Sequence, residues 1–242
     1  MPTSTQSIRE LVSTQSSAAA VLERFEIDIC SRADESLNQA CAELQLSVDQ
    51  VLDKLSDAAT SEAGEVPDLA SYSLTRLIQH IVRAHHQNVR RELPRLGEMA
   101  QKLAGKHGHR FPELKNVAVL LQKLHAEMLA HLQKEEQVLF PFIAQMEEGG
   151  TARASSGGAC FRTVAQPIST MNREHNSAEG ILAEIHSLTC GFNPSHQACP
   201  THVALFSGLS GFESNLREHV HLENDFLFPR AIEMETTLSQ GR

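Results

Sequence analysis

Two stretches of the chain place a histidine and a glutamate at the same spacing within the same longer pattern. The pattern H-x-x-x-E-x-x-x-L-F-P begins at His131 and again at His219, so the paired glutamates are Glu135 and Glu223. Residues four positions apart on a helix lie on the same face, one turn from each other. Each histidine and its glutamate can therefore bind the same metal centre, and the Leu-Phe that follows gives each helix apolar anchors beyond it.

One further histidine precedes each copy of the pattern at nearly the same distance. His86 lies 45 residues before His131, and His175 lies 44 residues before His219. This spacing indicates two helical hairpins of similar build. Antiparallel neighbouring helices of that span bring all six side chains to one level of a bundle. The predicted ligands are His86, His131, Glu135, His175, His219 and Glu223.

The types of side chain do not decide between iron, zinc, copper and manganese, because imidazole and carboxylate groups bind all four metals. Structural zinc sites usually close at four ligands, often with cysteine, so six ligands from four helices are too many for one such site. Two carboxylates that can bridge favour a pair of metal ions. Iron is the best-attested metal for carboxylate-bridged pairs inside helical bundles, and we expect a non-haem di-iron centre.

The helices that must position these residues are predicted from the periodicity of apolar residues. Four long helical stretches are expected with short connections, at about residues 73–104, 113–146, 164–188 and 199–234. No segment shows sustained strand alternation. We therefore predict an all-α fold in which these stretches form an antiparallel four-helix bundle.

A smaller helical part is expected before the bundle, with short helices at 16–25, 34–44 and 48–55. The stretch from Thr60 to Asp68 is rich in polar residues and helix breakers and predicts a linker. We therefore divide the chain into a small N-terminal helical domain, residues 1–60, and a bundle domain, residues 69–237.

Composition excludes several classes of partner and site. The net charge of −9 argues against nucleic acid and anionic membranes as partners. No apolar run reaches the roughly 20 residues of a membrane span, and the first ten residues lack the apolar core of a signal peptide. Five cysteines, an odd number without a CxxC pair, make a disulfide framework or a cysteine-type zinc site a poor fit. We expect a cytoplasmic protein.

Several segments together resemble one known family. They are Arg24–Cys30, His86–Pro94, Leu124–Glu127, His131–Pro141, Met171–His175 and His219–Pro229. The chain resembles, over nearly its whole length, the repair-of-iron-centres family of di-iron, hemerythrin-like proteins. The resemblance implies a hemerythrin-like bundle, a small N-terminal domain, and iron ligands at the six positions predicted above.

The resemblance also implies a function. Such proteins are associated with repair of iron–sulfur clusters after nitrosative and oxidative stress, so damaged iron–sulfur proteins are expected clients. Two mechanisms stay open: release of iron for rebuilding clusters, or reduction of NO to N₂O by the diferrous centre. The rival from another class is a hemerythrin-like NO or O₂ binder or sensor without turnover, so enzyme activity is undecided. The sequence does not fix the oligomeric state, and a homodimer is compatible with it.

Coordination counting adds to this expectation. Two irons with about six coordination positions each have about twelve in all. The four histidines fill about four of these, the two bridging glutamates about four, and an oxo or hydroxo bridge about two. Hemerythrin-like oxygen carriers usually have a further histidine four positions after the one at His175, where this chain has Glu179. About one position per iron therefore stays open, which suits a pair of NO molecules or easier release of iron.

Further residues carry expectations of their own. Glu127 lies one turn before His131, and Glu174 lies at a channel position of the family. Both could support the ligands or line a path for protons or iron. The alternative for Glu127 is an ordinary surface position. The family commonly has Cys-Cys where this chain has Cys30 and Ser31. Cys30 could therefore act only as a single thiol.

Neighbouring positions must be told apart at the predicted site. Consecutive helical residues diverge by about 100°, so only one of His85 and His86 is expected to face the core, and the family register selects His86. By the same reasoning Glu136 and His221 are expected to be solvated. Glu179, four residues after His175, is an alternative extra ligand.

Overall fold

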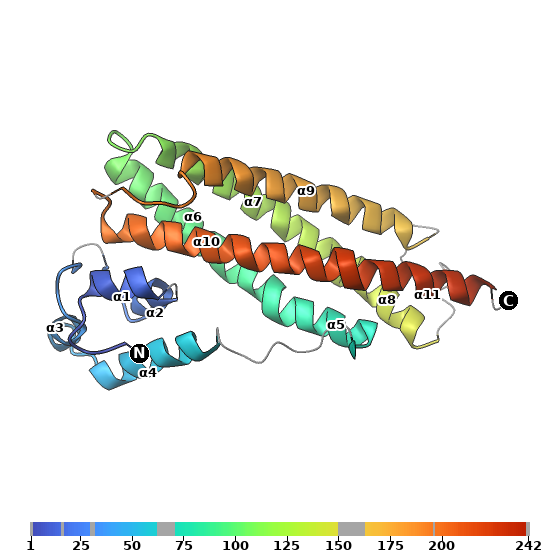
Figure 1. Cartoon of the computed structure of the whole chain (residues 1–242), viewed down its shortest axis with the longest axis horizontal. Helices are drawn as coiled ribbons and strands as arrows, with labels where there is room; N and C mark the ends of the chain where they lie inside the picture. The colour runs from blue at the N-terminus through green and yellow to red at the C-terminus, as the bar shows by residue number, and fades with distance from the viewer. Residues whose placement is uncertain are drawn as a thin grey trace.

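The structure is a computed structural model, and it describes residues 2–15, 17–29, 32–61, 71–149, 163–195 and 197–240. The predicted four-helix bundle is confirmed. Its rods are α5 (Leu74–Ile81), η2 (Val82–His86) and α6 (Gln87–His107); α7 (Glu113–Lys134), η3 (Glu135–Leu139) and α8 (Phe140–Glu147); α9 (Ala165–Leu188); and α10 (Pro200–His221), η4 (Leu222–Leu227) and α11 (Phe228–Gln240). Figure 1 shows these rods side by side and alternating in direction.

The N-terminal part contains α1 (Ile8–Thr14), α2 (Ala18–Arg24), α3 (Leu37–Glu43) and α4 (Val48–Ser61). The prediction missed α1, which begins at a capping box formed by Ser7 and Glu10, and it ended α4 six residues too early. Helices this short are unstable alone, so they depend on burying residues such as Leu11 and Leu22. The rest of the predicted linker, from residue 62 on, lies outside the described residues.

The N-terminal helices pack against one end of the bundle through α1 and α10 (Figure 1). One apolar cluster includes residues of both parts, from Ile8 and Leu37 to Leu96 and Leu209. The N-terminal part therefore covers an apolar face of the bundle, and the division between residues 60 and 69 stays a prediction.

The bundle has a second apolar cluster at its other end, which includes Leu77, Leu139, Met171 and Phe228. Between the two clusters lies a layer of buried polar residues. The six predicted ligands lie in the short interval where one cluster ends and the other begins, or one residue outside it. The two apolar halves hold this polar layer on both sides.

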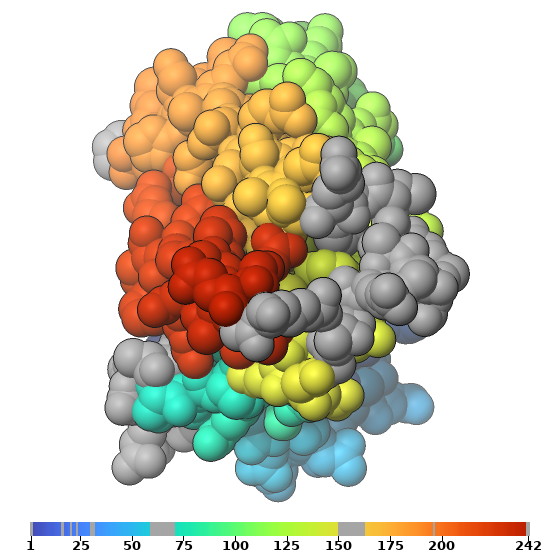
Figure 2. All heavy atoms as spheres, turned by 90° about the vertical axis from the view of Figure 1, so that its right-hand side faces the viewer, coloured from blue at the N-terminus to red at the C-terminus, as the bar shows by residue number. Residues whose placement is uncertain are grey.

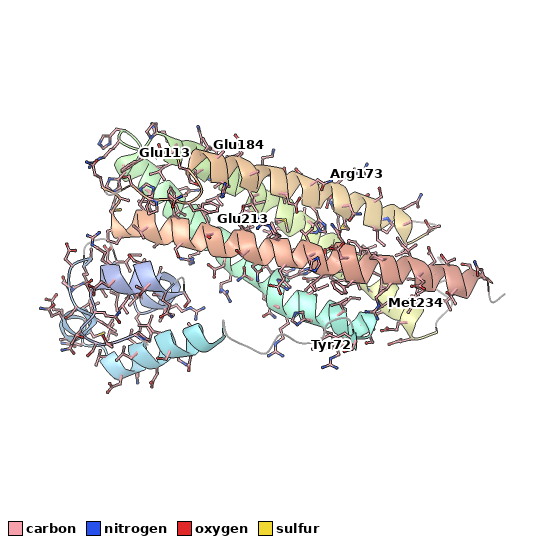
Figure 3. All side chains as sticks on the ribbon, viewed as in Figure 1. Tyr72, Glu113, Arg173, Glu184, Glu213 and Met234 are labelled. Carbon is pink, nitrogen blue, oxygen red and sulfur yellow. The ribbon has the colours of Figure 1, made fainter. Side chains whose placement is uncertain are left out.

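Contacts between helices fix the end of the bundle beyond the polar layer. Glu147 of α8 accepts hydrogen bonds from the backbone N–H groups of Leu74 and Thr75, at 2.7 and 2.8 Å, and so caps α5. Arg230 of α11 donates to the carbonyl of Tyr72 at 2.7 Å. Tyr72 and Met234, labelled in Figure 3, lie at this end, and Figure 2 looks onto it, with α11 beside α9 and above α5 and α8. These ties join the first, second and fourth rods at this end of the bundle.

Within the described residues, every helix is too short or too polar to pass through a lipid bilayer.

Candidate metal centre

The six predicted ligands come together in the buried polar layer. His86 ends η2, Glu135 begins η3, Glu223 lies in η4, and the remaining three lie on α7, α9 and α10. All six side chains are at most 1% exposed. Their donor atoms form two overlapping groups, and within each group all the atoms lie within 4.8 Å of one another. The first group is His131, His175, His219 and Glu223, and the second is His86, Glu135, His219 and Glu223.

The histidines form two close pairs. The Nε2 atoms of His131 and His175 are 3.0 Å apart, and those of His86 and His219 are 3.2 Å apart. The first pair joins α7 to α9, and the second joins η2 to α10. Four imidazole nitrogens therefore point at one small volume, two from each side of the bundle.

Each carboxylate lies between the two pairs. Glu135 Oε2 is 3.4 Å from His86 Nε2 and 3.3 Å from His131 Nε2. Glu223 places Oε2 3.1 Å from His175 Nε2 and Oε1 3.0 Å from His219 Nε2. Glu223 can therefore bind one metal ion with each oxygen, and Glu135 reaches one histidine of each pair through Oε2.

Three π-helical segments shape the site, and each contains a predicted ligand. A π turn closes a hydrogen bond to the fifth residue and holds one residue more than an α turn, and such turns are frequent at functional sites. Glu135 and Glu223 sit at or near the start of η3 and η4, so each H-x-x-x-E pair spans the change from α to π geometry. Periodicity alone did not reveal these segments.

The expectation that only one of His85 and His86 faces the core is wrong, because both side chains are buried, at 2% and 0% exposed, although only His86 belongs to a group of ligand atoms. Both lie in η2, where the wider turn changes the angle between successive side chains. The His85 ring stacks on that of His219 with the centroids 5.9 Å apart. Burial, and then His219, lowers the pKa of His85 to about 4. His85 therefore packs as a neutral ring behind a predicted ligand.

The electrostatics of the layer favour cations. Burial alone would raise the pKa of Glu223, but His219 and then His175 hold that pKa well below its ordinary value. Burial would lower the pKa of His131, but Glu135, Glu223 and Glu174 raise it to about 9. Among the described residues, neither oxygen of the fully buried Glu135 has a hydrogen-bond partner. Buried carboxylates need a compensating charge, and four imidazoles with two carboxylates form a donor set that fits iron.

Two glutamates contact the far side of the site histidines. Glu174 Oε2 is 3.1 Å from His131 Nδ1 and also contacts Lys134. Glu136 Oε1 is 2.7 Å from His86 Nδ1, and Arg90 binds both oxygens of Glu136. The expectation that Glu136 is solvated holds only in part, because its side chain is 28% exposed but its carboxylate also contacts His86. No sequence signal predicted its contact with His86, because that histidine is 50 residues away.

A cavity of about 370 Å³ reaches the site beside His131. Its lining includes Glu127 and Glu174, together with Lys134, and Arg173 of α9, labelled in Figure 3, stands at its exposed side. Glu127 accepts a hydrogen bond from Ser177 at 3.0 Å. The structure thus brings both of these predicted glutamates to one opening, with Glu174 in contact with a site histidine.

The other candidates lie apart from the site. Glu179 is exposed and belongs to neither group of ligand atoms, and His221 is exposed as expected, paired with Asp225. Cys30 lies outside the described residues.

Known proteins match both the bundle and the whole chain. Residues 77–231 match the family model of the hemerythrin HHE cation binding domain. The iron-sulfur cluster repair protein YtfE of Dickeya chrysanthemi is 34% identical over 230 residues, 95% of this chain and 98% of that protein. A probable iron-sulfur cluster repair protein of Haemophilus influenzae is 33% identical, covering 94% of this chain and 96% of that protein. YtfE of Escherichia coli O81 is 32% identical with the same coverage.

Proposed function

Because this chain belongs to the hemerythrin HHE cation-binding family and to the iron-sulfur cluster repair proteins, as its motifs predicted, we propose that it binds two iron ions and supplies iron for repairing damaged iron–sulfur clusters. The observation that carries the proposal is the position of Glu135 and Glu223, each between a histidine of one pair and a histidine of the other. That arrangement suits two metal ions joined by carboxylates.

The residues divide between the two ions by their distances. His131 and His175 would hold one iron, and His86 and His219 the other. Glu135 and Glu223 would bridge them, beside an oxo or hydroxo group from solvent. When bound, such a pair offers iron that can be released and, in the ferrous state, two electrons.

The cavity beside His131 supports release of iron. It begins where Glu174 contacts His131 Nδ1 and continues past Glu127. Burial would raise the pKa of Glu174, but the Lys134 ammonium and then His131 hold that pKa below its ordinary value, which favours the charged carboxylate. Carboxylate oxygens at this opening can bind a cation that leaves the site.

Iron transfer tests the proposal directly. The purified protein is loaded with ⁵⁷Fe and incubated anaerobically with a cluster-depleted iron–sulfur protein, sulfide and a thiol reductant. We expect ⁵⁷Fe clusters to form faster than with the same concentration of free iron and a chelator that binds iron equally tightly. Clusters that contain no ⁵⁷Fe from the protein would refute iron supply. Clients of this kind, and a cytoplasmic setting, belong to the same proposal.

A second candidate function is reduction of NO. Two NO molecules, two electrons and two protons give N₂O and water, and a ferrous pair can provide the two electrons. The exposed position of Glu179, where oxygen carriers of this fold have a further histidine, leaves room for about one open position on each iron.

NO added anaerobically to the diferrous protein separates the second candidate from its rival. More than one equivalent of N₂O in the presence of an electron donor supports an enzyme. Bound NO without N₂O supports the rival, a protein that binds or senses NO or O₂ without turnover.

A further inference from the structure

The two histidine pairs share a feature that the ligand count does not explain. In each pair one histidine has a glutamate at its Nδ1, namely Glu174 at His131 and Glu136 at His86. The Nδ1 atoms of the other two histidines, His175 and His219, are buried without a hydrogen-bond partner among the described residues. Each proposed metal position therefore has one histidine whose ring is fixed by a carboxylate and one whose ring is fixed by packing alone.

Glu136 holds the ring of His86 from the side opposite the proposed metal. Its Oε1 lies 2.7 Å from His86 Nδ1, so Nδ1 donates its proton and Nε2 is left as the electron-pair donor. Arg90 donates to Oε1 at 2.8 Å and to Oε2 at 3.0 Å. A guanidinium bound to both oxygens fixes the plane of the carboxylate, and through it the orientation of the imidazole.

The π turn η3 connects this contact to the bridging position. Glu135 and Glu136 are consecutive residues of η3, yet both reach His86: Glu135 Oε2 lies 3.4 Å from Nε2, and Glu136 Oε1 lies 2.7 Å from Nδ1. The same short segment thus places a carboxylate on the metal side of the ring and another on its outer side. Movement of η3 would displace both contacts together.

The corresponding contact on the other pair is looser. Glu174 lies 3.1 Å from His131 Nδ1 and is held by the single ammonium of Lys134 in place of a two-point guanidinium contact. The two carboxylates are almost equally exposed, at 30% for Glu174 and 28% for Glu136, so the difference lies in their partners. The His86 side of the site is therefore the more rigidly supported of the two.

We propose that Glu136, held by Arg90, is a positioning residue that fixes Nε2 of His86 on its metal ion and thereby determines how long the last iron is retained. This inference rests on the proposed iron-binding function. Carboxylates that support a ligating histidine typically change metal affinity by about 10- to 100-fold when removed. We expect Glu136→Leu to accelerate loss of the last iron to a chelator by a factor in that range.

The test uses the full chain loaded with two ⁵⁷Fe(II) ions and mixed anaerobically with an excess of a coloured Fe(II) chelator. Glu136→Leu is compared with Glu136→Gln, which keeps an oxygen acceptor for Nδ1–H but loses the charge that binds Arg90. Glu179→Gln is the matched control, since Glu179 is an exposed carboxylate one helical turn from His175. We expect release of the last iron to be fastest in Glu136→Leu, intermediate in Glu136→Gln, and unchanged in the control.

Mössbauer spectra of the loaded variants separate positioning from a general structural effect. In Glu136→Leu, the signal of only one of the two irons should change, whereas a disturbed bundle would alter both. A last-iron release rate equal to that of Glu179→Gln, or equal changes in both iron signals, would overturn the inference while leaving iron binding intact. A wild-type chain that binds no iron would instead refute the proposed function, and the inference with it.

Discussion

Replacing Glu223 by alanine should cost the protein both irons, whereas replacing His175 should cost only part of the affinity for one. The two side chains touch, with Glu223 Oε2 3.1 Å from His175 Nε2. Glu223 also places Oε1 3.0 Å from His219, which belongs to the other pair. Loss of the carboxylate opens a position on each iron and removes charge that offsets both in a buried site. Loss of the imidazole opens one position that water can fill.

The size of the effect follows from ligand linkage. A metal present at about 1,000 times its dissociation constant stabilises the fold by about 4 kcal/mol, so two contribute about 8 kcal/mol. For a chain of this length, 1 kcal/mol shifts Tm by about 2–4 °C, and iron should raise Tm by about 16–32 °C. Glu223→Ala should abolish this increase. If His175→Ala weakens one iron about 100-fold, it loses about 2.8 kcal/mol, or roughly 6–11 °C.

The assay is the difference in Tm between iron-loaded and iron-free protein, with iron content and Mössbauer spectra of the same samples. Using the difference cancels the cost of the cavity that each substitution leaves. Glu135→Ala should resemble Glu223→Ala, and His86→Ala should resemble His175→Ala, with the alanine variants of His131 and His219 in between. A glutamate variant that keeps a coupled iron pair, while a His175 variant loses all metal, would refute the bridging roles.

Three further outcomes are expected. A chain that begins at Asp68 should still bind iron, because all six ligands follow that residue. Its Tm should be lower, because the apolar face of α10 is exposed. A shortened chain with a helical CD spectrum that binds no iron would contradict the prediction. Cys30→Ala should leave the iron content unchanged, and iron-free Cys30→Ala protein would show a role for the thiol at the centre. His202 is buried between Phe111 and Phe206, and burial lowers its pKa. The unfolded chain therefore takes up more protons than the folded chain below about pH 6.5. In urea unfolding, the free energy of unfolding should fall more between pH 7 and pH 5 for the wild type than for His202→Leu. Equal decreases would contradict this prediction.

The repeated pattern at His131 and His219 predicted the bundle and the level of the site because helical periodicity and spacing are local properties. The same reasoning placed the ends of the four rods within three residues of those observed, except that the last rod ends at Gln240, six residues later than predicted. It missed α1, although the capping box from Ser7 to Glu10 marks its start. A search for capping boxes would have found it.

What sequence could not predict depends on contacts between distant residues and on irregular turns. The assumption of a uniform α turn placed His85 and Glu136 in solvent, whereas His85 of η2 is buried and Glu136 of η3, though 28% exposed, contacts His86. The pairing of Glu136 with Arg90 joins two helices across 46 residues. Only the packed bundle brings such partners together, so their roles became visible with the structure.

The central claim is a carboxylate-bridged pair of irons, and metal analysis with Mössbauer spectroscopy of the protein purified from iron-replete cells tests it most directly. We predict two irons per chain and, in the oxidised state, a spectrum of antiferromagnetically coupled ferric ions. One metal ion per chain, or zinc in place of iron, would contradict the account.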